Sequence, residues 1–230
     1  MMMRRLQSAV LLVLVVLCAN VCAAETIDRI VVVVDKGIIL ASEWEQSVRY
    51  EALLEGKDLR LVTAADRLRT LDRLIDQELL RQQIASTTYQ AASAEEVAAK
   101  VNDVRRQLLP GADDATWRAT LARYGLDEED VRERVATQLD ILRFIEARFR
   151  PSIRIDRRTV EAYYKNTYVP QMQARGAQSP PLAQASAGIE EVLVQQRIDD
   201  LLNAYLKNLR TQVRIRRLDE GTSTKEAQAR

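Results

Sequence analysis

The sequence contains no histidine, and its only two cysteines, Cys18 and Cys22, lie near the N-terminus. Without histidine the chain lacks the commonest metal ligand and the usual general base of enzymes. Nucleophilic catalysis by a Cys–His or Ser–His pair is therefore excluded. If the N-terminal residues are removed on export, as argued below, the mature chain has no thiol, and its fold relies on packing without disulfides.

Glycine, proline and aromatic residues are also scarce, with 7 Gly, 5 Pro and 5% aromatic residues among 230. The net charge is only +1, so no global field attracts nucleic acid or an anionic membrane. What remains is rich in Leu, Ala, Arg and Glu, which is typical of helical proteins. The composition predicts a mainly α-helical chain that is long enough to bury a real core.

Residues 1–24 have the pattern of a secretory signal peptide. Arg4 and Arg5 form a basic start, Ala9 to Leu17 an apolar centre, and Val21-Cys22-Ala23 a cleavage motif of mainly small residues. The apolar run is shorter than the ~20 residues of a membrane-spanning helix, which disfavours a retained anchor. A lipid anchor on either cysteine is disfavoured by the bulky residues that precede them. We expect export to the periplasm and no stable membrane span after cleavage.

One strongly β-prone stretch, Ile30 to Leu40, organises the mature chain. Its two apolar halves predict a β-hairpin in which Gly37 takes the positive φ of the turn. Ser42 then stands where an N-cap would open the first helix. Because a lone hairpin is marginal in water, we expect the alternating segment Val213 to Leu218 to complete a small sheet.

Between these ends, apolar residues recur at spacings of three and four, which predicts a helical bundle. Expected caps are Thr63, Ser93, Asp127 and Asp156. The predicted helices cover 43–55, the stretch after Thr63, the stretch from Ser93 to Pro110, 114–125, 127–150, 156–168 and 188–210. The predicted divisions are a helical domain at 25–168, a flexible loop rich in Gln, Ala, Ser and Pro at 169–187, a closing helix and strand at 188–218, and a disordered tail at 219–230.

The order of these segments resembles the N-terminal domain of SurA-type periplasmic chaperones. The resemblance rests on the Val-rich hairpin, on Leu71 to Leu80, on Asp114 to Arg150 with its short-helix, glycine, long-helix order, and on Ile153 to Tyr164. It covers nearly all of the mature chain and implies a chaperone module. In that family a parvulin-type prolyl isomerase domain comes next, but here 169–187 stands in its place. Parvulin-type sites use histidines, so the resemblance does not extend to isomerase activity.

Other groups of charged residues are explained more simply by structure than by catalysis. The carboxylates of Asp72 and Asp76 are flanked by arginines, which indicates a solvated, salt-bridged helix face. The acidic run Asp127 to Asp130 lies at a helix start, where negative charge is stabilised by free amide groups. The basic stretch Arg143 to Arg158 is diluted by acidic residues, and an exported protein rarely meets nucleic acid. We therefore expect no catalytic residue, metal, cofactor or nucleic-acid partner, although acidic client segments or anionic lipid headgroups could attract this stretch.

These features lead us to expect an ATP-independent holdase that binds unfolded exported or outer-membrane polypeptides. Its binding surface is expected in a cradle between residues 43–150 and the closing helix, because contiguous exposed apolar patches mark binding sites. The alternatives are a foldase related to peptidyl-prolyl isomerases, a scaffold subunit that binds one folded partner, and a homodimer through the closing helix. The candidate client-binding residues are Trp44, Leu53, Leu54, Trp117, Leu121, Tyr124, Phe144, Tyr163, Tyr164 and Leu202.

Overall fold

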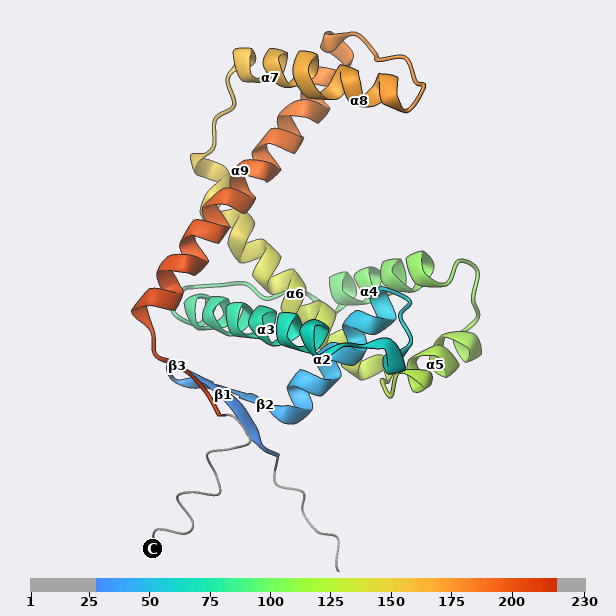
Figure 1. Ribbon diagram of the computed structural model, residues 1–230, viewed down its shortest axis with the longest axis vertical. Coiled ribbons are helices and arrows are strands. Elements are labelled where there is room, and N and C mark those ends of the chain that lie inside the picture. Colours follow the sequence, from blue (N-terminus) through green and yellow to red (C-terminus); the bar gives the residue numbers. More distant parts are fainter. Residues whose placement is uncertain (1–27, 219–230) are drawn as a thin grey trace, which may run out of the picture.

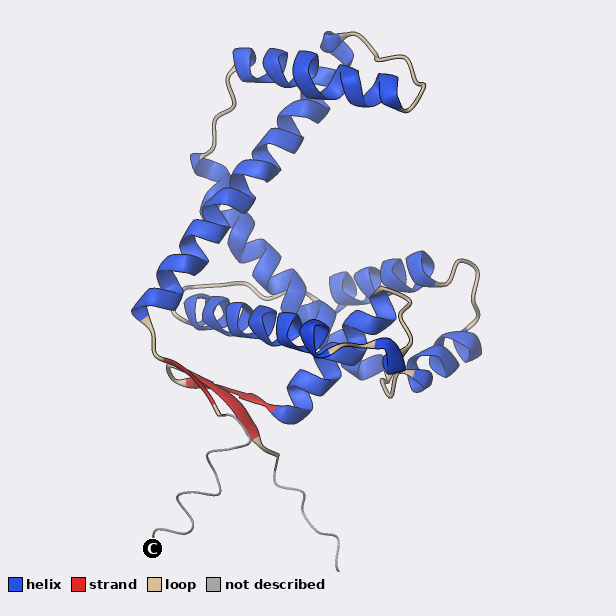
Figure 2. Ribbon diagram, viewed as in Figure 1, coloured by secondary structure: helices blue, strands red, loops and turns tan. Residues whose placement is uncertain are grey.

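The computed structural model describes residues 28–218, so the predicted signal peptide and the predicted C-terminal tail lie outside the described residues. The fold is mainly helical, with one small sheet (Figures 1 and 2). Its strands are β1 (Ile30–Val34), β2 (Gly37–Leu40) and β3 (Ile215–Arg217). Its helices are α2 (Ala41–Leu54), α3 (Ala64–Ala85), α4 (Ala94–Leu108), α5 (Asp114–Arg123), α6 (Glu128–Phe149), α7 (Arg157–Tyr163), α8 (Val169–Ala174) and α9 (Leu182–Gln212), with short turns η1 (Leu59–Leu61), η2 (Arg150–Ser152) and η3 (Tyr164–Tyr168).

The sheet joins the two ends of the described chain, as predicted. Strand β1 lies in the centre, antiparallel to β2 on one side and to β3 on the other, with Val33 opposite Ile38 and Arg216. The hairpin turn differs from the prediction in one respect. The positive φ belongs to Asp35 (51°) and not to Gly37, because the left-handed residue comes first in the turn and Asp tolerates that conformation.

Helix starts agree with the expected caps at four positions. Thr63, Ser93 and Asp127 each form a capping box with the residue three positions later, and the Asp156 side chain accepts from the Thr159 amide. The prediction for Ser42 was wrong. Helix α2 already begins at Ala41, and both the amide and the hydroxyl of Ser42 donate to the Asp28 carboxylate instead.

Four apolar clusters hold the helices together. The sheet packs on α3 and on the end of α9. Helix α5 and the first half of α6 pack on α2 and α4, and the end of α6 packs on the middle of α9. The fourth cluster is much smaller and lies where α7 meets the start of α9. In the ribbon view, α6 and α9 cross and carry α7 and α8 away from α4 and α5, so the molecule has the outline of a letter C (Figure 1).

The segment predicted as a flexible loop at 169–187 is mostly helical. A π-helical turn at Tyr164–Tyr168 passes directly into α8, and α9 starts at Leu182 rather than near Gly188. Only residues 175–181 lie outside helices. The prediction failed because Pro170 falls in the first turn of α8, where a proline does not interrupt helix hydrogen bonding. Within residues 28–218, no helix combines the length and apolar character needed to cross a bilayer.

Candidate functional site

Four of the ten predicted binding residues are core residues. Leu53, Trp117, Leu121 and Phe144 are at most 7% exposed and fill the clusters described above. Their burial leaves no surface for a ligand in this conformation. On α6 the exposed apolar residue is Leu142, at 50%, and it was not among the predicted residues. Spacing alone marked both flanks of that helix as apolar and did not reveal which flank faces α9.

Two further residues, Trp44 and Leu202, are half-buried and held by neighbouring groups. The indole N–H of Trp44 donates to the backbone oxygen of Arg67 at 2.9 Å, and the Arg67 guanidinium lies 5.7 Å from the ring centroid. Leu202 packs against the cluster between α6 and α9. Both side chains therefore contribute mainly to packing.

Tyr163 and Tyr164 lie on a projecting part of the molecule, which we call the arm and define as residues 157–189 (Figure 1). They are half-buried, together with Tyr168 and Met172, which were not predicted. Tyr164 and Tyr168 stack with ring centroids 5.8 Å apart, and the Tyr164 hydroxyl donates to the Pro180 oxygen at 2.8 Å. The sequence does contain a signal for this weakly charged surface, because Lys165 and Arg175 are the only charged residues between positions 162 and 189.

The arm has little interior of its own. Only Val160, Ala185 and Ile189 are buried among its residues. A cavity of 460 Å³ lies beside this cluster, between α7 and the first turns of α9. Its apolar lining comes from Ile155, Val160, Leu182 and Ala183, and its charged or polar lining from Arg157, Glu161, Ser186 and Glu190. The half-buried tyrosines of the arm therefore pack on a small cluster and keep part of each ring exposed.

Leu54 and Tyr124 lie at the other end of the C. Leu54, 41% exposed, ends α2, and half-buried Tyr124 follows α5. Tyr124 lines two adjoining cavities, of 310 and 340 Å³, between η1 and the end of α5. We call these two cavities together the η1–α5 groove. The predicted residues that remain accessible are thus divided between two separate surfaces.

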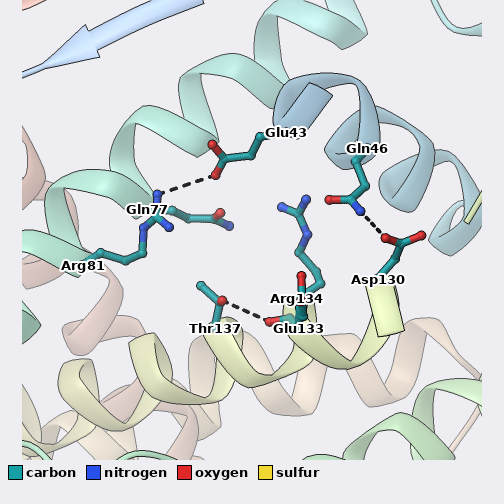
Figure 3. A pocket seen from close by; sticks show the side chains of 8 residues that line it. All are labelled: Glu43, Gln46, Gln77, Arg81, Asp130, Glu133, Arg134 and Thr137. Atoms are coloured by element: carbon teal, nitrogen blue, oxygen red, sulfur yellow. Dashed lines mark hydrogen bonds and ion pairs between the residues drawn. The ribbon is translucent and has the colours of Figure 1, made fainter. Parts of the chain in front are cut away.

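A fourth cavity, of 240 Å³, lies between α2, α3 and α6 and is strongly polar (Figure 3). The Arg134 side chain projects into it from α6 and donates to the Ser47 hydroxyl at 2.6 Å. Burial lowers the pKa of Arg134, and the nearby Glu43 carboxylate opposes that shift. Gln46 donates to Asp130, and Arg81 lies 3.6 Å from Glu43, so the charges in this cavity are largely matched by neighbours.

Large pKa shifts at two groups come from structural contacts. The hydrogen bond from Arg60 lowers the pKa of exposed Asp58 to about 2. Burial, with help from the Asp140 carboxylate, raises the pKa of Tyr89 to about 12. Among residues 28–218 no group of three acidic or thiol side chains is placed to hold a metal ion.

No family model matches the sequence, and no curated protein matches it.

Proposed function

We propose that this protein is an ATP-independent holdase of the cell envelope. It binds unfolded segments of exported or outer-membrane polypeptides, with the arm as the main contact surface. This agrees with what the resemblance to SurA-type chaperones implies. The observation that carries the proposal is the arm itself, which has only three buried side chains, several half-buried tyrosines packed on them, and a 460 Å³ cavity between α7 and the start of α9.

The chemistry of the arm suits a client without fixed structure. Tyrosine presents a large apolar face at low entropic cost, and methionine adapts to irregular shapes. Between residues 162 and 189 only Lys165 and Arg175 are charged, which limits the desolvation cost of covering that part of the arm. The cavity itself also presents Arg157, Glu161 and Glu190 to a client. Such a surface binds many apolar sequences without selecting one.

Binding to this surface is expected to be weak for its area, because an unfolded client loses chain entropy when it is ordered. Weak binding allows release without ATP. The chain connects the arm to the rest of the molecule only through α9 and the segment 150–156. Small changes in backbone conformation at these two connections can therefore reorient the arm.

The test is suppression of aggregation of a denatured outer-membrane protein by the purified mature chain. We expect protection at a few-fold molar excess, and we expect Ser186→Trp to reduce it at least twofold by filling the arm cavity. Gln196→Trp is the matched control, because Gln196 is exposed on the same helix but does not line that cavity. Absence of protection by the unmodified chain at tenfold excess would exclude the proposal, and equal protection by both variants would exclude the arm cavity as the contact surface.

A further inference from the structure

The η1–α5 groove has an apolar floor. Val48 contributes from α2, Leu59 and Val62 from the η1 segment, and Ala122 and Tyr124 from the end of α5. Its two cavities share Leu59, Arg123 and Tyr124, so they form one continuous depression. Leu59 and Val62 are half-buried and belong to none of the four core clusters.

The groove exists because two helices end beside each other with left-handed glycines. Gly56 (φ 62°) follows α2, and Gly125 (φ 65°) follows α5. In both cases the chain reverses at once, with the Lys57 amide donating to Ala52 and the Leu126 amide donating to Leu121. A side chain at position 125 would meet the Arg49 guanidinium at 2.7 Å, so this glycine also leaves the space that Arg49 occupies.

The groove carries a small excess of positive charge. It is lined by three arginines, Arg49, Arg67 and Arg123, and by two carboxylates, Glu45 in the 310 Å³ cavity and Asp58 in the 340 Å³ cavity. Asp58 is already bound by Arg60, at 2.7 Å. Glu45 accepts from both Arg49, at 3.3 Å, and Arg67. Arg123 is exposed and makes no ion pair or side-chain hydrogen bond within residues 28–218. Its position in the last turn of α5 complements the helix dipole, but its guanidinium N–H groups remain free for a carboxylate.

We infer that this groove binds an extended polypeptide segment in which an apolar residue is followed or preceded by Asp or Glu. The apolar side chain rests on Leu59, Val62 and Tyr124, and the carboxylate accepts from Arg123. The inference goes beyond the proposed function, because it assigns a sequence preference to a surface separate from the arm. It holds or fails independently of whether the arm protects unfolded proteins.

Fluorescence anisotropy of three labelled peptides tests the inference with the mature chain at low salt. The peptides share one apolar segment and differ only in a flanking Asp, Asn or Lys. We expect the Asp peptide to bind at least fivefold more tightly than the Lys peptide, and the difference to shrink at high salt. Arg123→Glu should reverse the order of the two charged peptides. Arg118→Glu, on the same helix and exposed but outside the groove, should leave the order unchanged.

A second variant tests the apolar floor without touching any of the core clusters. Leu59→Ser should weaken all three peptides by a similar factor, and circular dichroism should show unchanged helix content. Equal affinity for the three peptides, or the same order of affinities in Arg123→Glu as in the unmodified chain, would overturn the inference. The two proposals can be tested separately. If Ser186→Trp loses aggregation suppression but still discriminates among the peptides, the arm protects unfolded proteins and the groove binds acidic peptides independently.

Discussion

Asp66 shows how one side chain can serve several contacts at a helix start. Its carboxylate accepts from Lys57 and from the Thr63 amide, the latter at 2.9 Å, and these bonds hold the pKa of Asp66 well below its ordinary 3.8. A lowered pKa in the folded state means that the carboxylate contributes stability above pH 3.8, and this contribution is lost as the pH falls toward the folded-state value. Acid should therefore remove part of the stability of α3.

Urea unfolding from pH 7 to pH 2.5 tests this prediction. Asp66→Asn should be less stable than the unmodified chain at neutral pH, and the difference should shrink as the pH falls below 4. Asp200→Asn removes an exposed carboxylate of α9 that makes no ion pair within residues 28–218, and it should follow the unmodified chain throughout. A difference that stays constant down to pH 2.5 would contradict the assigned role of Asp66.

Individual residues also mark the limit of prediction from sequence. The caps at Thr63, Ser93, Asp127 and Asp156 were predictable because a cap is set by residues within four positions. Ser42 was not, since its partner Asp28 lies outside that window. Burial of Phe144 beside exposed Leu142 depends on where α9 crosses α6, which spacing along α6 does not contain.

At the scale of single elements, α5 is short and depends on one large side chain. Trp117 is 2% exposed and packs with Leu121, Val131 and Tyr50 in the second cluster. Trp117→Ala should lower the free energy of unfolding by about 3–5 kcal/mol, because it leaves a large cavity. Denaturant titration of this variant against Arg118→Ala, an exposed neighbour expected to change stability by less than about 0.5 kcal/mol, measures the effect. A loss below about 1 kcal/mol would show that the cluster closes around the gap.

The arm and α3 should differ in local stability. Helix α3 has seven buried residues, whereas α7 has one and α8 has none. Local opening needs least free energy where few apolar contacts are broken. Hydrogen exchange should therefore be much faster at amides 160–174 than at amides 71–80, and slower in the arm when a client is bound. Equal protection in the two regions would mean that the arm is held by more than its own cluster.

The arm is also the element that the sequence described least well. Residues 169–187 have the composition of a loop, yet helix covers both ends of this stretch. The π-helical turn at Tyr164–Tyr168 and the tyrosine stack depend on contacts with Pro180 and the start of α9, which composition does not express. By contrast, the sheet was predictable because β-branched runs are rare in this chain and occur at its two ends.

For the whole molecule, we predict that prolyl isomerase activity is missing. The chain has no histidine, and residues 169–187, where the resemblance to SurA-type chaperones would place an isomerase domain, fold as part of the arm. A protease-free assay with a proline tetrapeptide should give the uncatalysed rate at any concentration of the mature chain. Acceleration that increases with protein concentration and is lost in Ser186→Trp would show that the arm has a catalytic role as well.

The pairing of β1 with β3 has a consequence for folding during synthesis. Val33 finds its neighbour Arg216 only after almost the entire described chain has been made. Until then one side of β1 offers bare amide and carbonyl groups to any passing strand, and the loop that must close is long, which slows the final step. During synthesis from the N-terminus, the sheet therefore lacks β3 until the end, and the open edge of β1 is exposed to aggregation. We expect the yield of folded protein to depend on protection of this edge before β3 pairs with it.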